Sequence, residues 1–321
     1  MRPKWSVMIP AYNCGEFLGE AIESVLRQDP GEEYMQIEVV DDASTDIDVA
    51  ALVLEIGKGR VKYFRQDVNT GSLRNFETAI NRATGHYIHL LHGDDRVKPG
   101  FYAHIERLFE QFPEAAASFS CWDYINGNGA LIKKESARAA SPGIIENCLH
   151  KLSRGQMIQY VSMVVKRNVY EELGSFYGVF YGEDWEMWAR IAKHHPIAYT
   201  PESLAEYRTH YNSITGHSFL NGNNIRDLRK VFKAIGQMLP EEDRKQASLA
   251  VRRNYAIWAL EATRFMWQRT GNHLFVYRQL FELLKLYPNL QLFFRSVALL
   301  LRIWKVTLRK KLGKLKRKLI G

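Results

Sequence analysis

The amino-acid sequence predicts an α/β fold with a mixed, mostly parallel sheet flanked by helices, followed by a C-terminal region made only of helices. Over the first two-fifths of the 321 residues, short apolar runs alternate with amphipathic segments, which is the pattern of strands joined by crossover helices. From about residue 222 the pattern is helical to the end, with few glycines and no strand signal. The 321 residues exceed the length of one typical domain, and the 46% of hydrophobic residues are typical of an ordered globular protein.

The expected elements follow in order along the chain. Strands are expected near residues 5–10, 35–41, 60–65, 86–91 and 115–121, and helices near residues 14–28, 46–57, 71–83 and 98–111. Later, Met157–Lys166 predicts another apolar strand, and the helix after it ends at Gly174. In sheets of this class, ligands bind at the carboxyl ends of the strands. The residues that follow each strand are therefore the candidates for a functional site.

The first two strands end in residues that suit a nucleotide. The first ends in Pro10, Ala11 and Tyr12, where the aromatic ring could stack on a base or be an ordinary turn residue. The second ends in Asp41 and Asp42, and a carboxylate there can accept hydrogen bonds from a base or from ribose hydroxyls. The hydroxyl residues that follow could instead simply cap the next helix.

The third and fourth strands lead to residues that suit a phosphate and a cation. Gly71 lies in a polar turn before a helix, which suits a group near a phosphate with Arg74 as a cationic contact, although the same residues form ordinary turns. The fourth strand ends directly in Asp94 and Asp95, whose like charges repel each other. A bound cation relieves this repulsion most simply. The alternative is an acidic turn that starts the next helix.

Several function classes are disfavoured by what the sequence lacks. It has no G-x-G-x-x-G after the first strand, as a dinucleotide-binding dehydrogenase would have, and no P-loop motif. The three cysteines are widely spaced, which predicts neither a disulfide framework nor a metal cluster and fits a reducing compartment. We expect no signal peptide and no membrane-spanning helix.

A second acidic pair, Glu183 and Asp184, precedes an amphipathic helical segment. Acidic residues at a helix start are stabilised by the helix dipole, so a well-capped helix is one interpretation. The functional interpretation is that Asp184 is a general base that takes a proton from an acceptor hydroxyl.

Three motifs in order, Ser6–Asn13, Val39–Asp46 and Leu91–Asp95, resemble those of family 2 glycosyltransferases, which have the GT-A fold and use nucleotide-diphosphate sugars. The resemblance covers roughly residues 4–215, and three ordered motifs are far more specific than one. It implies that the Tyr12 region and Asp42 contact the nucleotide, usually uridine. A nucleotidyltransferase of sugar phosphates, which uses the same sheet, is an alternative that the sequence disfavours, because the Gly-rich, Lys/Arg-bearing loop expected after the first strand is missing.

The same resemblance assigns roles to the acidic pairs. It implies that Asp94 and Asp95 hold Mg²⁺ or Mn²⁺ against the diphosphate, and it favours Asp184 as the base, because the family carries Glu-Asp there. Arg208 and His210 could reach the diphosphate or the metal as the site closes. His92 replaces an Asp that many members carry. It could be a spare metal ligand or a solvent-facing substitution, and the second interpretation is favoured because hard cations prefer oxygen. Two carboxylates then predict weak metal binding without nucleotide.

These observations predict a catalytic domain over residues 1–220, with nucleotide-sugar binding in 1–122 and acceptor binding and catalysis in 123–220. The expected activity is inverting transfer of a sugar from a nucleotide-diphospho-sugar to a hydroxyl of a glycan or lipid-linked glycan in surface polysaccharide assembly. The resemblance implies a UDP-sugar as the donor. A non-catalytic nucleotide-sugar-binding protein remains an alternative. A processive synthase is disfavoured because its Gln-x-x-Arg-Trp motif and membrane helices are missing.

Residues 221–321 are expected to form a helical region that ends in a basic amphipathic helix at about 290–320. Eleven of the lysines and arginines and no acidic residue follow Glu282, so of the net charge of +9 the preceding chain carries −2. The helix bears one narrow apolar stripe, which consists of Val297, Leu301, Trp304, Leu308, Leu312, Leu315 and Leu319. This pattern predicts docking on an anionic membrane, on the cytoplasmic face of the inner membrane. A helix packed on the catalytic domain and a nucleic-acid-binding tail are the alternatives, but no nucleic-acid-binding module is present.

Overall fold

A computed structural model describes residues 2–176, 178–210 and 213–320. The strands are β1 (Trp5–Ala11), β2 (Met35–Asp41), β3 (Lys62–Arg65), β4 (Tyr87–Leu90), β5 (Arg96–Val97), β6 (Ala117–Ile125), β7 (Leu131–Lys134), β8 (Gly143–Ile144), β9 (Met163–Lys166) and β10 (Ile197–Arg208). The helices are α1 (Gly15–Leu26), α2 (Val49–Gly57), α3 (Ser72–Arg82), α4 (Phe101–Gln111), α5 (Cys148–Leu152), α6 (Arg167–Leu173), α7 (Glu183–His194), α8 (Ile214–Asn221), α9 (Asn223–Met238), α10 (Glu241–Thr270), α11 (His273–Leu286) and α12 (Leu290–Ile320). The predicted fold class is confirmed.

The sheet is mixed, with the strand order β3-β2-β1-β4-β9-β6-β10-β5. The pairs β2–β3, β1–β2, β1–β4 and β6–β10 are parallel, whereas β9 runs antiparallel to both of its neighbours. The expected strand over Met157–Lys166 is therefore too long. Only its last four residues form β9, because a 3₁₀ turn at Tyr160–Ser162 precedes them.

Two apolar cores lie on the two faces of the sheet, because side chains alternate along each buried strand. In β1, Val7 and Ile9 face the core covered by α1, α2 and α4, and Met8 faces the opposite core. Helices α3, α6 and α7 cover that second face. Every residue of β1 is buried, as expected for a strand with helices on both sides.

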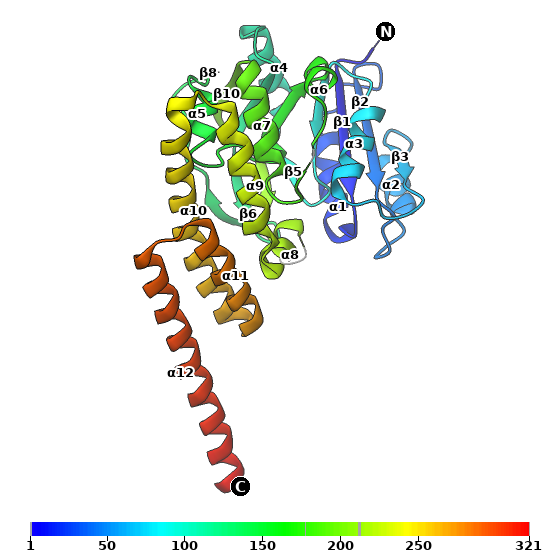
Figure 1. The fold of residues 1–321 in the computed structure, drawn as a ribbon. Coiled ribbons are helices and arrows are strands. Elements are labelled where there is room, and N and C mark those ends of the chain that lie inside the picture. Colours follow the sequence, from blue (N-terminus) through cyan, green and yellow to red (C-terminus); the bar gives the residue numbers. More distant parts are fainter. Residues whose placement is uncertain (1, 177, 211–212, 321) are drawn as a thin grey trace.

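The second core continues into the C-terminal helices, which lie along one side of the body (Figure 1). Helix α9 packs against α7, and α10 packs against α9 and α11. Helix α12 has the expected bounds and projects away from the sheet (Figure 1). Its buried residues Leu292, Leu299 and Ile303 belong to the same core. Among the described residues, no helix is both long enough and apolar enough to cross a membrane.

Candidate active site

A cavity of about 1250 Å³ opens at the carboxyl ends of β1, β2 and β4. It collects nine of the predicted site residues, which come from six separate segments: Pro10, Ala11, Tyr12, Asp42, Gly71, Asp94, Glu183, Asp184 and His210. The other three, Arg74, Asp95 and Arg208, do not line it. The fold therefore brings most of the predicted site together, and the three exceptions have different physical reasons.

Asp42 organises the end of the cavity next to β1 and β2. Its Oδ1 accepts hydrogen bonds from the Thr70 backbone N at 2.7 Å and the Thr70 hydroxyl at 2.8 Å, and its Oδ2 accepts one from the Gly71 N at 2.9 Å. Gly71 has φ of +85°, a conformation that glycine adopts without strain. Tyr12 is about half exposed, at 51%, on the same cavity wall. Asp42 thus joins the end of β2 to the loop that follows β3, beside the exposed ring of Tyr12.

Arg74 lies on the outer side of α3 and is not brought to the cavity. Its side chain is exposed and forms an ion pair with Glu77 at 2.7 Å. The next residue, Asn75, points inward instead and donates a hydrogen bond from Nδ2 to the Val40 carbonyl at 2.8 Å. Neighbouring helix positions are about 100° apart around the axis, so both side chains cannot face the site.

The Asp94–Asp95 turn contains two carboxylates in different electrostatic states. Asp94 Oδ2 is 2.9 Å from His210 Nε2. Burial raises the pKa of Asp94, but the His210 hydrogen bond and the nearby His92 outweigh burial and hold that pKa below its usual value. Burial and the adjacent Asp94 charge raise the pKa of Asp95 well above its usual value. Of the two Asp95 oxygens, Oδ1 accepts the Arg208 backbone N–H at 2.8 Å, and Oδ2 has no hydrogen-bond partner among the described residues.

His92 is not solvent-facing, which corrects the prediction from the sequence. Its ring stacks on Phe76 with centroids 5.1 Å apart and contacts Tyr160 at 4.3 Å. Burial lowers the pKa of His92, and its Nε2 is buried without a partner among the described residues. Ligand atoms of His92, Asp94 and Asp95 lie within 4.8 Å of one another. The partners Phe76 and Tyr160 are distant in sequence, so the motif alone could not reveal this orientation.

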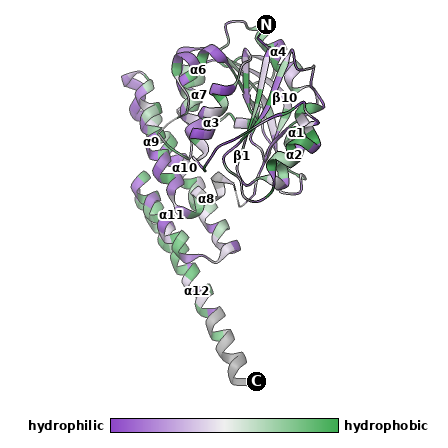
Figure 2. Ribbon diagram, turned by 90° about the vertical axis from the view of Figure 1, so that its right-hand side faces the viewer, coloured by the Kyte–Doolittle hydropathy of each residue, from purple (hydrophilic) through white to green (hydrophobic). Residues whose placement is uncertain are grey.

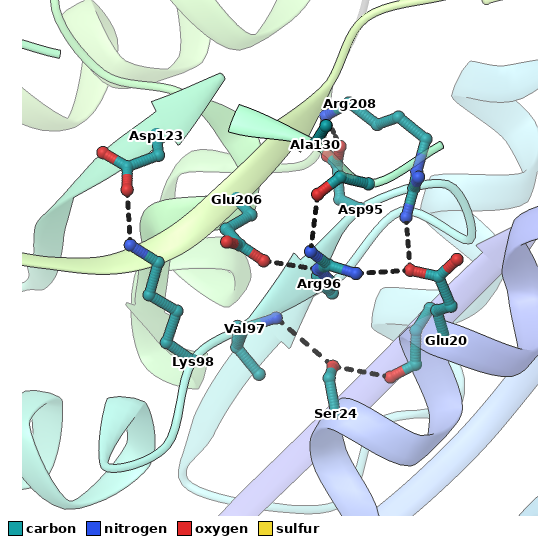
Figure 3. A network of polar contacts seen from close by, with 12 residues as sticks. Glu20, Ser24, Asp95, Arg96, Val97, Lys98, Asp123, Ala130, Glu206 and Arg208 are labelled. Atoms are coloured by element: carbon teal, nitrogen blue, oxygen red, sulfur yellow. Dashed lines mark hydrogen bonds and ion pairs between the residues drawn. The ribbon is translucent and has the colours of Figure 1, made fainter. Parts of the chain in front are cut away.

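Arg208 lies beneath the Asp94–Asp95 turn rather than in the cavity. The residue is 1% exposed, and its guanidinium donates to the Asp94 carbonyl at 2.8 Å, the Gly127 carbonyl at 2.9 Å and Glu20 at 2.7 Å. Glu20 also accepts from Arg96, as Figure 3 shows. The predicted contact of Arg208 with a diphosphate is therefore replaced by a structural role, in which it holds the acidic turn in place.

The second acidic pair forms the first turn of α7. Asp184 Oδ2 accepts a hydrogen bond from Gln156 Nε2 at 2.7 Å, and its Oδ1 accepts one from the Trp185 backbone N at 2.7 Å. Burial raises the pKa of Asp184 to about 6. Burial and the charge of Asp184 raise the pKa of Glu183 well above its usual value. Asp184 is therefore the member of the pair that is ionised at neutral pH, as a general base requires.

Sequence reasoning missed several residues of the cavity. Gln156 lies just before, and Tyr160 lies within, the segment expected to be an apolar strand, so the sequence assigns neither residue to the site. Asn254, Tyr255 and Trp258 come from α10, in the region expected to be separate from the catalytic part. Their helical spacing marks one face of α10, but only the packing of α10 on α9 turns that face to the cavity.

Comparison with known proteins agrees with this architecture. Residues 6–174 match the family described as Glycosyl transferase family 2. An uncharacterised glycosyltransferase from Haemophilus influenzae is 28% identical over 224 residues, which cover 65% of this chain and 67% of that protein. TuaG of Bacillus subtilis, a predicted teichuronic acid biosynthesis glycosyltransferase, is 26% identical over 225 residues, covering 68% and 84%.

Among solved structures, S. aureus TarS 1–349 in complex with UDP-GlcNAc has a similar fold. The TM-score is 0.66 at 14% identity, and the match covers 88% of this chain and 80% of TarS 1–349. This likeness confirms the predicted GT-A fold. The family match spans more than half of the chain and includes the three strand-end motifs. The chain therefore belongs to glycosyl transferase family 2.

Proposed function

We propose that this protein is an inverting glycosyltransferase that moves a sugar from a nucleoside-diphosphate sugar to a hydroxyl of a glycan or lipid-linked glycan. The observation that carries the proposal is that one cavity is lined both by Asp94, at the end of β4, and by Asp184, at the start of α7. The first position suits a nucleotide diphosphate, because ligands of such sheets bind at the strand ends. The second supplies a base with a pKa of about 6 in the same space.

The donor end of the cavity lies beside Tyr12 and Asp42. A half-exposed tyrosine ring offers a face for a base, and the Asp42 oxygens keep lone pairs for further donors after binding the 70–71 backbone. TarS was crystallised with UDP-GlcNAc, which supports a UDP-linked donor here.

The acidic turn fits a divalent cation. Asp95 Oδ2 and His92 Nε2 are both buried without a partner among the described residues. One ligand atom of each of His92, Asp94 and Asp95 lies within 4.8 Å of the other two. Two carboxylates suit Mg²⁺ or Mn²⁺. His92, Asp94 and Asp95 would hold the ion, and His210 would orient Asp94 through its hydrogen bond. When bound, the ion would neutralise charge on the departing diphosphate.

The chain's own residues supply the proton transfer. Asp184 takes the proton of the acceptor hydroxyl while the oxygen of that hydroxyl attacks the anomeric carbon of the donor. The bond between the anomeric carbon and the diphosphate breaks in the same step. A single displacement inverts the anomeric configuration. Gln156 orients Asp184 by donating to Oδ2, which leaves the other carboxylate lone pairs for the acceptor.

The experiment that tests the activity is a screen of nucleotide-sugars for thermal stabilisation and for release of the nucleoside diphosphate, with and without Mn²⁺. Binding to the folded state raises stability with the logarithm of ligand concentration over Kd. We expect a UDP-sugar to stabilise the protein and to be slowly hydrolysed without acceptor. Stabilisation without any hydrolysis or transfer would favour a non-catalytic binding protein, and pyrophosphate release from a nucleoside triphosphate and a sugar phosphate would favour a nucleotidyltransferase.

The proposal includes docking on the cytoplasmic face of the inner membrane, as part of surface polysaccharide assembly. The likeness to TuaG supports this setting. Along α12, Leu301 and Trp304 are 61% and 65% exposed, and the basic residues Arg302 and Lys305 lie beside them. Figure 2 shows apolar and hydrophilic residues mixed along α11 and α12. An exposed apolar surface with positive charges suits an anionic lipid surface.

Flotation with phosphatidylglycerol-containing vesicles tests the docking. The variant Leu301→Ser/Trp304→Ser/Leu308→Ser changes exposed side chains of α12 and leaves the buried ones in place. The matched control replaces three exposed apolar residues elsewhere: Leu54→Ser/Leu131→Ser/Ile132→Ser. We expect the α12 variant alone to stay unbound. Equal flotation of both variants would reject docking through α12.

A further inference from the structure

Helix α10 contributes a wall of the cavity that the donor and the base do not use. Val251, Asn254, Tyr255 and Trp258 all line the cavity, and their spacing of three, four and seven residues places them on one face of the helix. The face is apolar and buried at Val251 and becomes exposed at Asn254 and Trp258.

The aromatic residues of this face are held by neighbouring rings. Trp258, which is 51% exposed, contacts Tyr255 with centroids 5.1 Å apart and meets Phe219 edge to face at 5.9 Å. The Tyr255 hydroxyl accepts a hydrogen bond from Asn224 Nδ2 at 3.2 Å, and Asn224 Oδ1 in turn accepts from Gln279 at 2.9 Å. The indole is therefore exposed to the cavity but oriented by packing.

The same wall is connected to the turn that carries the base. Trp185, next to Asp184, meets Phe232 of α9 edge to face at 5.2 Å, and Phe232 meets Tyr255 at 6.0 Å. A Cβ on Gly182 would lie 2.8 Å from Leu228 Cδ2, so α9 approaches this turn closely. The packing of α7, α9 and α10 side by side thus sets the α10 face relative to Asp184 (Figure 1).

We infer that this face of α10, formed by Asn254, Tyr255 and Trp258, is a subsite for a pyranose ring of the acceptor. An aromatic ring offers a flat apolar face to the C–H groups of a sugar, and an exposed amide can both donate to and accept from its hydroxyls. A mostly apolar wall with few polar groups is the usual composition of a small-molecule site. The donor end of the cavity is formed instead by residues of the strand ends, such as Tyr12 and Asp42.

This inference rests on the proposed function, because it assigns the sugar to the acceptor that Asp184 deprotonates. It is tested by saturation-transfer NMR with methyl pyranosides at millimolar concentration as the probe: the methyl glycosides of glucose, galactose, rhamnose and N-acetylglucosamine. Wild type, Trp258→Ala and Trp258→Phe are compared. Phe265→Ala is the matched control, because Phe265 is 50% exposed on α10 and does not line the cavity.

We expect at least one pyranoside to bind wild type and the control equally, with an affinity about tenfold weaker in Trp258→Ala and intermediate in Trp258→Phe. Unchanged binding in Trp258→Ala, or no binding of any pyranoside to wild type, would overturn the inference. The inference would also be overturned if Trp258→Ala bound the pyranosides normally and lost affinity only for a UDP-sugar in calorimetry, because the subsite would then belong to the donor. Failure of wild type to bind any nucleotide-sugar would instead reject the proposed function, whichever way the pyranoside comparison turned out.

Discussion

Replacing Asp184 with Asn removes the charge of the proposed base and one of its two acceptor oxygens, the one that now accepts from Gln156 Nε2. An asparagine has the same size, and its side-chain oxygen can still accept the Trp185 backbone N–H that now binds Asp184 at 2.7 Å. General bases contribute about 10²- to 10⁴-fold to rate, so we expect kcat to fall by that factor while donor affinity is unchanged. Transfer is measured as release of the nucleoside diphosphate in the presence of acceptor.

The pH dependence provides a second measurement of the same group. Because the pKa of Asp184 is raised from 3.8 to about 6 by burial, kcat/KM of the wild type should fall about tenfold per pH unit below pH 6 and level off above it. The residual activity of Asp184→Asn should lack this acidic limb.

The stability of the variant should move in the opposite direction to its activity. The pKa of Asp184 is higher in the folded state than in the unfolded state, so protonated Asp184 stabilises the folded state. This stabilisation is fully present below about pH 4 and is lost as pH rises through 6. At pH 7, a shift of about two pKa units corresponds to a destabilisation of at most about 3 kcal/mol, reduced by solvent in the cavity. We therefore expect Asp184→Asn to be more resistant to urea than wild type at pH 7, and equal to it at pH 4.

The matched control is Asp48→Asn at the start of α2, where the side chain caps the helix by accepting the Ala51 N–H at 3.0 Å. Asparagine caps about equally well, so neither activity nor stability should change. An Asp184→Asn protein that keeps full turnover and an acidic limb would remove Asp184 from the role of base. A variant that is both inactive and less stable than wild type would mean that the carboxylate is structural.

Three further substitutions test the acidic turn. In calorimetry, Asp95→Ala should weaken UDP-sugar binding at least about tenfold with Mn²⁺ and leave metal-free binding unchanged; an equal loss without metal would contradict a role as ligand. His92→Phe keeps an aromatic ring against its neighbours but removes Nε2, and it should weaken Mn²⁺ binding; an unchanged Kd would show that His92 only packs. Arg208→Lys loses the planar guanidinium that donates to the acidic turn, and its free energy of unfolding in urea should fall by about 3 kcal/mol. The control Arg74→Lys changes an exposed arginine and should show no measurable loss of this free energy.

The sequence by itself determined the local elements and the chemistry at their ends. The helix expected at 98–111 is α4 (Phe101–Gln111), and the basic helix expected at 290–320 is α12. These predictions succeed because helical and strand periodicity depend on neighbours a few residues apart. The strand-end motifs also placed Tyr12, Asp42 and Asp94 at one cavity, since parallel strands end at the same edge of a sheet.

The tertiary structure decided where the remaining side chains point. His92 turns inward because Phe76 and Tyr160 form an aromatic contact for it, and Arg208 turns beneath the acidic turn because Glu20 of α1 and the Asp94 carbonyl accept its N–H groups. The α10 face joins the cavity only through the packing of α10 on α9. Each of these outcomes depends on a partner far along the chain, and a pattern of local residue types does not contain that partner.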